Sequence, residues 1–223
     1  MSFADDAASD LHGHVAIITG ANHGIGAATA QALADRGASV FLTYLRLERS
    51  SDSGVPSPYD RYRSSDAQQV VDHILADGAR AAAIEVDLAD AASVGFLFDA
   101  AEERFGPVDI LVNNASGWAA DSFLPEGTSD PGREFVALSA TTVDRTFAVD
   151  GRAPALLIGE FARRHIARGA RWGRIVGLTS GGPLGFPQEV SYGAAKAAHD
   201  NFTMSPGLEF AEHGITANMV TLR

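Results

Sequence analysis

Short runs of apolar residues alternate with amphipathic stretches along most of the chain. The apolar runs end at glycine or at polar residues, as buried strands usually do. We expect strands at residues 14–19, 39–44, 81–86, 108–113, 174–178 and 215–220. The stretches between them have apolar residues at helical spacing and predict helices at about 24–36, 66–77, 91–105, 139–168 and 190–212. Because strands that alternate with helices form parallel sheets through right-handed crossovers, the pattern predicts a doubly wound α/β fold with helices on both faces.

A few segments depart from this alternation. Residues 1–12 are expected to form a flexible tail, and residues 46–65, rich in serine, proline and alternating charges, an exposed insertion loop. We expect another polar loop from Trp118 to about residue 130. Pro206 lies inside the last predicted helix and predicts a kink or break there, because proline lacks the N–H that a helix interior needs. No linker divides the chain, so residues 1–223 are expected to form a single domain.

Composition and charge narrow the class of protein. A net charge of −11 would repel a nucleic-acid backbone, so we do not expect a nucleic-acid partner. The apolar stretches are shorter than the roughly 18 residues that a membrane span needs, and no membrane association is expected. The chain has no cysteine, which excludes disulfides and thiolate metal ligands and is compatible with a cytoplasmic location. We predict a cytoplasmic protein without a metal site.

A glycine cluster follows the first predicted strand and opens the first predicted helix. Residues 19–26 read Thr-Gly-Ala-Asn-His-Gly-Ile-Gly. Such glycines permit a tight turn and let a pyrophosphate approach the backbone at a helix N-terminus. We therefore predict a dinucleotide site in this turn, formed by Gly20, Asn22, His23, Gly24, Ile25 and Gly26. The alternative is that the glycines serve only the packing of helix against strand.

A phenol and an ammonium group lie four residues apart in the predicted helix 190–212. Tyr192 and Lys196 therefore share one helix face. A free phenol, with a pKa near 10, is a weak acid at neutral pH, but a neighbouring Lys⁺ favours its ionised form. This makes Tyr192 a candidate general acid and base. Taken alone, the same spacing is more often found on a solvated helix face.

These motifs occur together in a characteristic order. The glycine turn, residues 113–115 (Asn-Asn-Ala), Ser180, and the Tyr192–Lys196 pair follow one another along the chain. From about residue 13 to 220 the chain resembles the short-chain dehydrogenase/reductase family, in particular its 3-oxoacyl-acyl-carrier-protein reductase-like members. The resemblance implies a Rossmann fold, an NAD(P)-dependent oxidoreductase and a carbonyl or secondary-alcohol substrate. By position, it implies that Ser180 binds the substrate oxygen, Tyr192 exchanges the proton and Lys196 holds the nicotinamide ribose.

The resemblance also assigns residues at the adenosine end of the cofactor. It implies that Asp87 and the adjacent Leu88 lie at the adenine ring. It also implies that Asn113, Asn114 and Ala115 line the adenosine side while supporting the central strand. Each has a structural alternative: Asp87 could cap the following helix, and Asn113 could satisfy buried backbone groups.

The chain departs from the family pattern at four places. Ser116 stands where glycine is usual, and Asp150 stands where an asparagine supports a water relay to the lysine. We expect Asp150 to form a salt bridge with Lys196 or to disturb that relay, and count it among the candidate catalytic residues. Ser180 precedes the tyrosine by one residue fewer than usual, so Thr179 is an alternative to it. The chain ends where relatives continue through a substrate-covering segment and a last strand, which we expect to be missing.

The segment after the second predicted strand bears on cofactor preference. It contains Arg46 and lacks the acid that usually binds the ribose 2′-hydroxyl of NAD. His23 lies where many NADP-dependent relatives have a basic residue. The sequence therefore favours NADP(H), with NAD(H) possible if Glu48 folds back toward the ribose.

Loop residues and the resemblance to the family also bear on the substrate, the assembly and the activity. Aromatic and apolar residues near the carboxyl ends of strands suggest a substrate with an apolar body, although local packing explains them equally well; they are Trp118, Phe123, Leu184 and Phe186. The resemblance implies a homodimer or homotetramer paired through helices 139–168 and 190–212. The main rival function is a catalytically impaired, nucleotide-binding sensor or scaffold. A lyase of the same fold that works without nucleotide is disfavoured by Lys196 and the glycine turn.

Overall fold

The computed structural model describes residues 11–48, 57–129, 132–181 and 185–222. Within them, a six-stranded parallel sheet has the order β3-β2-β1-β4-β8-β9. Its strands are β1 (Val15–Ile18), β2 (Ser39–Tyr44), β3 (Arg80–Glu85), β4 (Ile110–Asn113), β8 (Gly173–Ser180) and β9 (Ile215–Leu222). The chain runs outward from β1 to β3 and then returns to the other side of β1 with β4. The carboxyl ends of β1 and β4 therefore form a topological switch point, where such sheets bind ligands.

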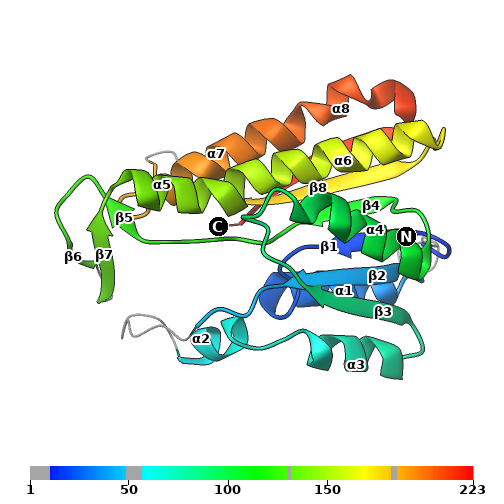
Figure 1. The fold of residues 1–223 in the computed structure, drawn as a ribbon, viewed down its shortest axis with the longest axis horizontal. Coiled ribbons are helices and arrows are strands. Elements are labelled where there is room, and N and C mark those ends of the chain that lie inside the picture. The colour runs from blue at the N-terminus through cyan, green and yellow to red at the C-terminus, as the bar shows by residue number, and fades with distance from the viewer. Residues whose placement is uncertain (1–10, 49–56, 130–131, 182–184, 223) are drawn as a thin grey trace, which may run out of the picture.

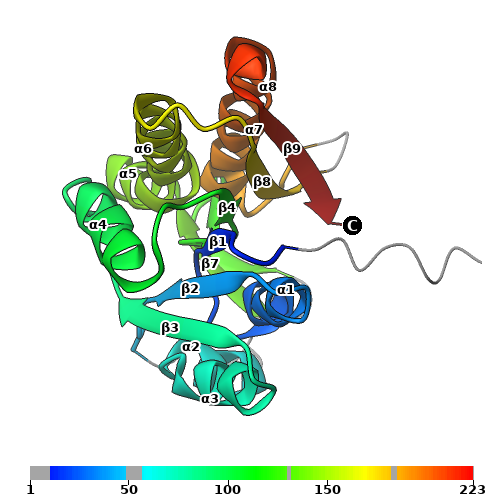
Figure 2. The ribbon, with the colours of Figure 1, turned by 90° about the vertical axis from the view of Figure 1, so that its right-hand side faces the viewer.

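Helices cover both faces of the sheet (Figures 1 and 2). One face carries α1 (Gly24–Ala34) and α3 (Gln68–Ala76), and the other carries α4 (Ser93–Phe105), α5 (Ala140–Phe147), α6 (Ala153–Ala167) and α7 (Val190–Met204). Each face of the sheet has its own hydrophobic core, and successive residues of β1 point into different ones. Ile17 belongs to the same core as Phe98 and Phe161, whereas Ile18 belongs to the core that contains Ile74. The predicted doubly wound α/β fold is confirmed.

Two predicted loops contain regular structure. In the predicted insertion loop, α2 (Ser57–Arg63) is helical, and the Asn22 amide donates hydrogen bonds to the carbonyl oxygens of Tyr62 (3.0 Å) and Ser65 (2.9 Å). Residues 49–56 of that loop lie outside the described residues. The predicted polar loop contains β5 (Asp121–Ser122) and β6 (Gly127–Ser129), which flank β7 (Arg133–Ala137) in a small sheet of order β5-β7-β6. Both loop predictions were wrong in this respect, because short polar elements have no apolar periodicity.

The predicted break at Pro206 is present in the structure, and the long predicted helix is interrupted. Pro206 separates α7 from α8 (Pro206–Glu209), as its missing N–H predicts. The predicted long helix is α5 and α6 joined by a π-helical turn, Ala148–Arg152.

At the N-terminus, Leu11 packs on the core and donates a backbone hydrogen bond to Arg36 (2.9 Å), so the predicted tail does not include it. Residues 1–10 lie outside the described residues, and no helix in the described part is long and apolar enough to cross a membrane.

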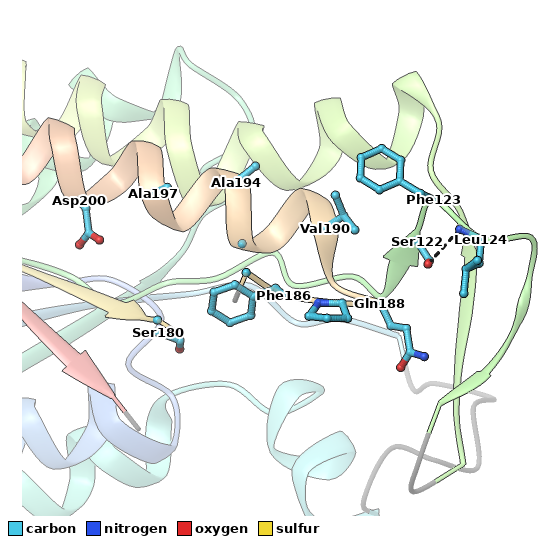
Figure 3. A pocket seen from close by; sticks show the side chains of 14 residues that line it. Ser122, Phe123, Leu124, Ser180, Phe186, Gln188, Val190, Ala194, Ala197 and Asp200 are labelled. Atoms are coloured by element: carbon cyan, nitrogen blue, oxygen red, sulfur yellow. Dashed lines mark hydrogen bonds between the residues drawn. The ribbon is translucent and has the colours of Figure 1, made fainter. Parts of the chain in front are cut away.

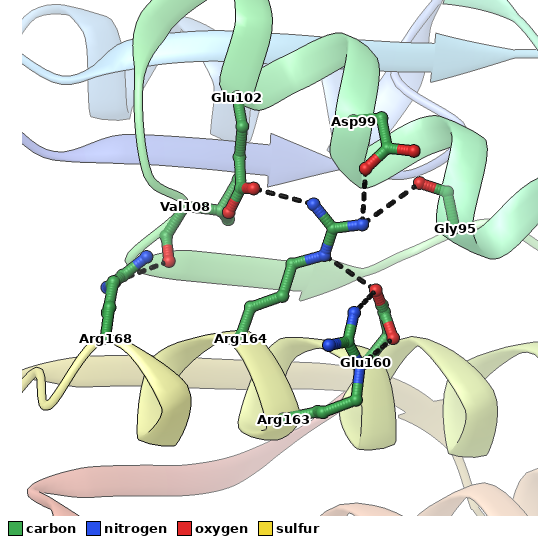
Figure 4. A network of polar contacts seen from close by, with 8 residues as sticks. All are labelled: Gly95, Asp99, Glu102, Val108, Glu160, Arg163, Arg164 and Arg168. Carbon is green, nitrogen blue, oxygen red and sulfur yellow. Dashed lines mark hydrogen bonds and ion pairs between the residues drawn. The ribbon is translucent and has the colours of Figure 1, made fainter.

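An ion-pair network joins α4 to α6 (Figure 4). The Arg164 guanidinium donates to Glu160, Glu102 and Asp99, in each case at 2.6 Å. Hydrogen bonds from Arg163, and then from Arg164, lower the pKa of Glu160 to about 2, against the opposing effect of burial. The ionised carboxylate is therefore favoured in the folded state.

We expect this network to make stability depend on acid. Since the pKa of Glu160 falls from 4.5 to about 2 on folding, its contribution is present above pH 4.5 and is lost as the pH falls toward 2. The free energy of unfolding of Glu160→Gln should decline less over this window than that of the parent. Urea unfolding at a series of pH values measures it, and identical slopes for the two proteins would contradict the assignment.

Candidate active site

The glycine turn at the end of β1 has the geometry of a phosphate-binding turn. Gly20 and Gly24 have positive φ angles, +63° and +57°, which residues other than glycine rarely adopt. A Cβ at Gly20 would lie 2.8 Å from the Ala115 Cα, and one at Gly26 would lie 2.5 Å from the Asn114 side chain. By contrast, a Cβ at Gly24 would meet no atom within 4 Å. Gly20 and Gly26 are therefore needed for packing, whereas Gly24 leaves open space at the N-terminus of α1.

Asn114 and Thr19 hold this turn in place. The Asn114 amide donates to the carbonyl oxygens of Thr19 and Gly20, both at 2.8 Å. The Thr19 hydroxyl accepts from the backbone N–H groups of Asn114 and Ala115, both at 3.0 Å. Asn113 is also buried, but its amide has no hydrogen-bond partner among the described residues. The suggestion that Asn113 satisfies buried backbone was wrong; Asn114 does so.

A pocket of about 440 Å³ lies beside the turn. Its lining includes Asn22, His23, Gly24, Tyr62 and Asp66. The Tyr62 ring is stacked on the His23 ring with centroids 6.1 Å apart. Burial, and then the nearby Arg63, lower the pKa of His23. In the absence of an anion, His23 is therefore biased toward the neutral form.

The other residues expected at the adenosine end lie nearby. Arg46 pairs with Glu85, with Nη2 and Oε2 2.6 Å apart, so its charge is already shared with a carboxylate. Asp87 is exposed and accepts a hydrogen bond from the Ala89 N–H at 2.8 Å. It therefore stabilises the turn before α4 and does not cap that helix, which begins at Ser93. Leu88 is buried in the core, and Ile25 is exposed.

Ser180 and Tyr192 meet on the opposite side of the switch point. Ser180 ends β8, Tyr192 lies in the first turn of α7, and their hydroxyl oxygens are 3.2 Å apart. The Thr179 hydroxyl is buried and bonds to the backbone oxygen of Ser180 at 3.3 Å. Of the two candidate hydroxyl groups, the one at Ser180 therefore lies next to the phenol, despite the shorter spacing.

Lys196 and Asp150 form a buried ion pair behind the phenol. Lys196 Nζ lies 3.0 Å from Asp150 Oδ1, donates to the Leu178 carbonyl at 3.2 Å, and is 5.5 Å from the centroid of the Tyr192 ring. Asp150 lies in the π-helical turn, and its Oδ2 accepts a hydrogen bond from Gly117 at 2.7 Å. Because both side chains are buried, the pair is shielded from water. The salt bridge expected from the sequence is present.

A pocket of about 780 Å³ opens in front of Ser180 (Figure 3). Phe123 and Leu124 line it from the loop after β5, Phe186 from the loop before α7, and Asp200 from α7 itself. Phe186 packs edge-on against Tyr192 with centroids 5.7 Å apart. Two of the predicted substrate residues, Phe123 and Phe186, therefore reach the pocket. Trp118 is not among its lining residues and stacks on Arg133 (4.7 Å), and Leu184 lies outside the described residues.

Several site residues could not be predicted from the sequence. Leu124 and Asp200 belong to no recognisable motif, and Asp121 lies within the predicted polar loop although it is fully buried. Among the described residues, no group of three or more His, Asp or Glu side chains is arranged to hold a metal ion.

Comparisons with known proteins identify the family of the chain. The chain matches the short chain dehydrogenase family over residues 14–54 and 59–222. The uncharacterized oxidoreductase YjdA of Bacillus subtilis (strain 168) is 34% identical over 209 residues, 92% of this chain and 72% of that protein. The hydroxynaphthalene reductase-like protein Arp2 of Metarhizium guizhouense (strain ARSEF 977) is 32% identical over 222 residues, 99% of this chain and 71% of that protein.

A solved structure gives the same picture. The short chain dehydrogenase from Burkholderia cenocepacia J2315 in complex with NADP is 34% identical, with a TM-score of 0.73 over 95% of this chain and 74% of that one. The order of the parallel sheet, together with these matches, places the chain among the α/β oxidoreductases. The chain belongs to the short-chain dehydrogenase/reductase family.

Proposed function

We propose that the protein reduces a ketone of largely apolar body with NADP(H), with Tyr192 as the proton donor. The observation that carries this proposal is the continuous set of contacts from the open pocket through Ser180 and Tyr192 to buried Lys196. A carbonyl oxygen placed between the two hydroxyl groups would receive a hydrogen bond from Ser180 and the proton of Tyr192. Lys196 stabilises the phenolate that this transfer leaves behind.

The residues at the switch point fit a dinucleotide. The open space at Gly24 and the first N–H groups of α1 suit the pyrophosphate. Ala115 and Asp87 would lie toward the adenosine. Lys196 would bind the nicotinamide ribose, which must lie near Tyr192 for hydride and proton to reach the same carbonyl group. When bound, the cofactor supplies the hydride that a carbonyl carbon accepts.

Two observations support NADP(H) over NAD(H). Arg46 lies two residues beyond the end of β2 with no acid between them, and the similar Burkholderia structure contains NADP. The Arg46–Glu85 pair reduces the positive charge that a 2′-phosphate would meet, so Glu85 sets how strong the preference is.

The preference can be measured by thermal shift with NADPH and NADH. We expect the parent to be stabilised more by NADPH, Arg46→Asp to lose that difference and Glu85→Gln to enlarge it, because the guanidinium is then released for the phosphate. Asp35→Asn, at the far end of α1, controls for the general effect of removing one negative charge. Equal shifts for both cofactors in all variants would refute the assignment.

The pocket walls favour an aromatic substrate. Phe123, Leu124 and Phe186 line the pocket that also contains Ser180, and two of the three are flat aromatic rings. One similar protein bears the name hydroxynaphthalene reductase-like. We therefore propose planar, fused-ring ketones or hydroxyarenes in their keto form as the substrate class.

A direct test is NADPH oxidation with a panel of tetralone-type bicyclic ketones and aliphatic ketones of similar size. Turnover of the bicyclic set, with lower activity on the aliphatic set, would support the proposal. The second candidate function, a nucleotide-binding sensor, is favoured by the Asp150–Lys196 ion pair, which holds the lysine away from other partners. Saturable NADPH binding without turnover of any ketone would favour the sensor.

We further propose a homodimer or homotetramer that pairs through α5, α6 and α7. Exposed apolar side chains on α6 and α7 support the proposal; among them are Leu156, Ile166 and Phe202. Multi-angle light scattering would detect it, and a monomer at assay concentration would exclude it.

A further inference from the structure

Asp121 is a fully buried carboxylate in a strand of only two residues. Its Oδ1 accepts a hydrogen bond from the Ser191 backbone N–H at 2.9 Å, and its Oδ2 accepts one from the Ser191 hydroxyl. β5 is held in turn by parallel pairing with β7. The small sheet is thus fixed to the first turn of α7, although the bonded residues lie 70 positions apart.

Hydrogen bonding keeps this buried carboxylate ionised. Burial alone would raise the pKa of Asp121, but hydrogen bonds from the Ser191 hydroxyl and N–H, with further ones from Thr142 and Val190, bring it below its usual value. The donors come from both α5 and α7. A negative charge at this place is also favoured by the partial positive charge at the N-terminus of α7.

The sequence of α7 explains why it needs a cap from elsewhere. Helices usually satisfy their first N–H groups with a local side chain at the N-cap. Here the N-cap residue is Glu189, whose side chain forms no capping hydrogen bond within the described residues, and Gln188 before it has a left-handed φ of +67°. Glu189 instead contacts Arg133 of β7 at 3.4 Å. Asp121 supplies the missing acceptor.

The residue that Asp121 holds is next to the candidate proton donor. Ser191 immediately precedes Tyr192, whose hydroxyl must meet Ser180 from another element at 3.2 Å. A reacting group displaced by about 1 Å can lose on the order of 100-fold in rate. The point at which α7 begins therefore matters for the alignment of Tyr192 with Ser180.

We propose that Asp121 is a positioning residue that aligns Tyr192 by capping α7 from the small sheet. This proposal rests on the proposed proton-transfer role of Tyr192. The small sheet already lines the pocket through Ser122. The proposal gives it a second role, which is to set the position of the helix that carries the proton donor.

The test compares Asp121→Ala and Asp121→Asn with the parent on the ketone found to be the best substrate. Asp121→Ala should lower kcat per NADPH-binding site about 10- to 100-fold, with the KM and Kd of NADPH nearly unchanged, and should raise the solvent deuterium isotope effect on kcat. Asp121→Asn keeps an acceptor for the Ser191 N–H and a donor for its hydroxyl, so it should recover most of the loss. The control is Ile74→Val, which removes one buried methyl group from α3 on the other face of the sheet and costs roughly 1 kcal/mol of stability.

The control separates alignment from general destabilisation. Ile74→Val should retain the parent kcat and isotope effect. The proposal is overturned if Asp121→Ala keeps the parent kcat per site, if Asp121→Asn is no better than Asp121→Ala, or if Ile74→Val produces the same loss.

A second measurement does not depend on turnover. Fluorine NMR of protein containing 3-fluorotyrosine reports the surroundings of each phenol, and Tyr192→Phe identifies the resonance of Tyr192. That resonance should move in Asp121→Ala and stay in place in Ile74→Val. If the parent reduces no ketone, the proposed function fails while this shift still tests the alignment; a resonance unchanged in Asp121→Ala overturns it.

Discussion

Replacement of Tyr192 by phenylalanine is expected to lower kcat for ketone reduction by at least about 100-fold while NADPH binds nearly as before. The substitution removes only the hydroxyl that lies 3.2 Å from Ser180 and keeps the ring that packs edge-on against Phe186. Loss of kcat without a change in the Kd of NADPH is therefore the signature of a lost proton donor. Stopped-flow NADPH oxidation and a fluorescence titration of NADPH measure the two quantities.

Neighbouring residues supply the controls. Ser180→Ala should also lower kcat, whereas Thr179→Val, which removes the adjacent buried hydroxyl with little change of shape, should not. Lys196→Ala should weaken both turnover and NADPH binding, since the ammonium is assigned to the phenol and to the ribose. A folded Tyr192→Phe protein that reduces a proven substrate at the parent rate would end the proposed mechanism.

The parts of the fold that follow from the sequence are those with a strong local pattern. The apolar runs gave the six parallel strands, and the glycine turn at residues 19–26 lies at the switch point because backbone geometry there admits no other residue type at Gly20. Pro206 ends α7 for an equally local reason. The Tyr192–Lys196 spacing is likewise a property of one helix.

Features that depend on tertiary contacts could not be predicted in the same way. β5 has two polar residues, and the burial of Asp121 follows from partners about 70 residues away. Glu85 ends β3 and Arg46 lies two residues beyond the end of the neighbouring strand β2, so their pairing requires the register of β2 and β3. α2 follows no apolar period and is held by hydrogen bonds from Asn22.

Asp150→Asn is expected to have opposite effects on stability and on turnover. The carboxylate is the buried counter-charge of Lys196, at 3.0 Å, so its removal leaves an ammonium group buried and uncompensated. Breaking one side of such a pair costs roughly 3 kcal/mol. The asparagine retains an oxygen that can accept the Gly117 N–H, so the local backbone should persist. Urea unfolding without cofactor should show the loss, and saturating NADPH should reduce it if Lys196 then binds the ribose.

The same substitution should raise kcat several-fold in the cofactor-saturated enzyme. In the parent, Asp150 offsets part of the positive charge that stabilises the Tyr192 phenolate; in the variant, the full charge of Lys196 acts on the phenol. In the alcohol-oxidation direction, where the phenolate is the base, the rising limb of the pH dependence of kcat should therefore move to lower pH. Asp144→Asn, on the exposed side of α5, controls for the loss of one negative charge and should leave both quantities unchanged. Asp150→Asn could instead lower kcat tenfold or more with NADPH binding intact. That result would mean that the Asp150 carboxylate itself takes part in proton transfer, in the place where relatives use an asparagine.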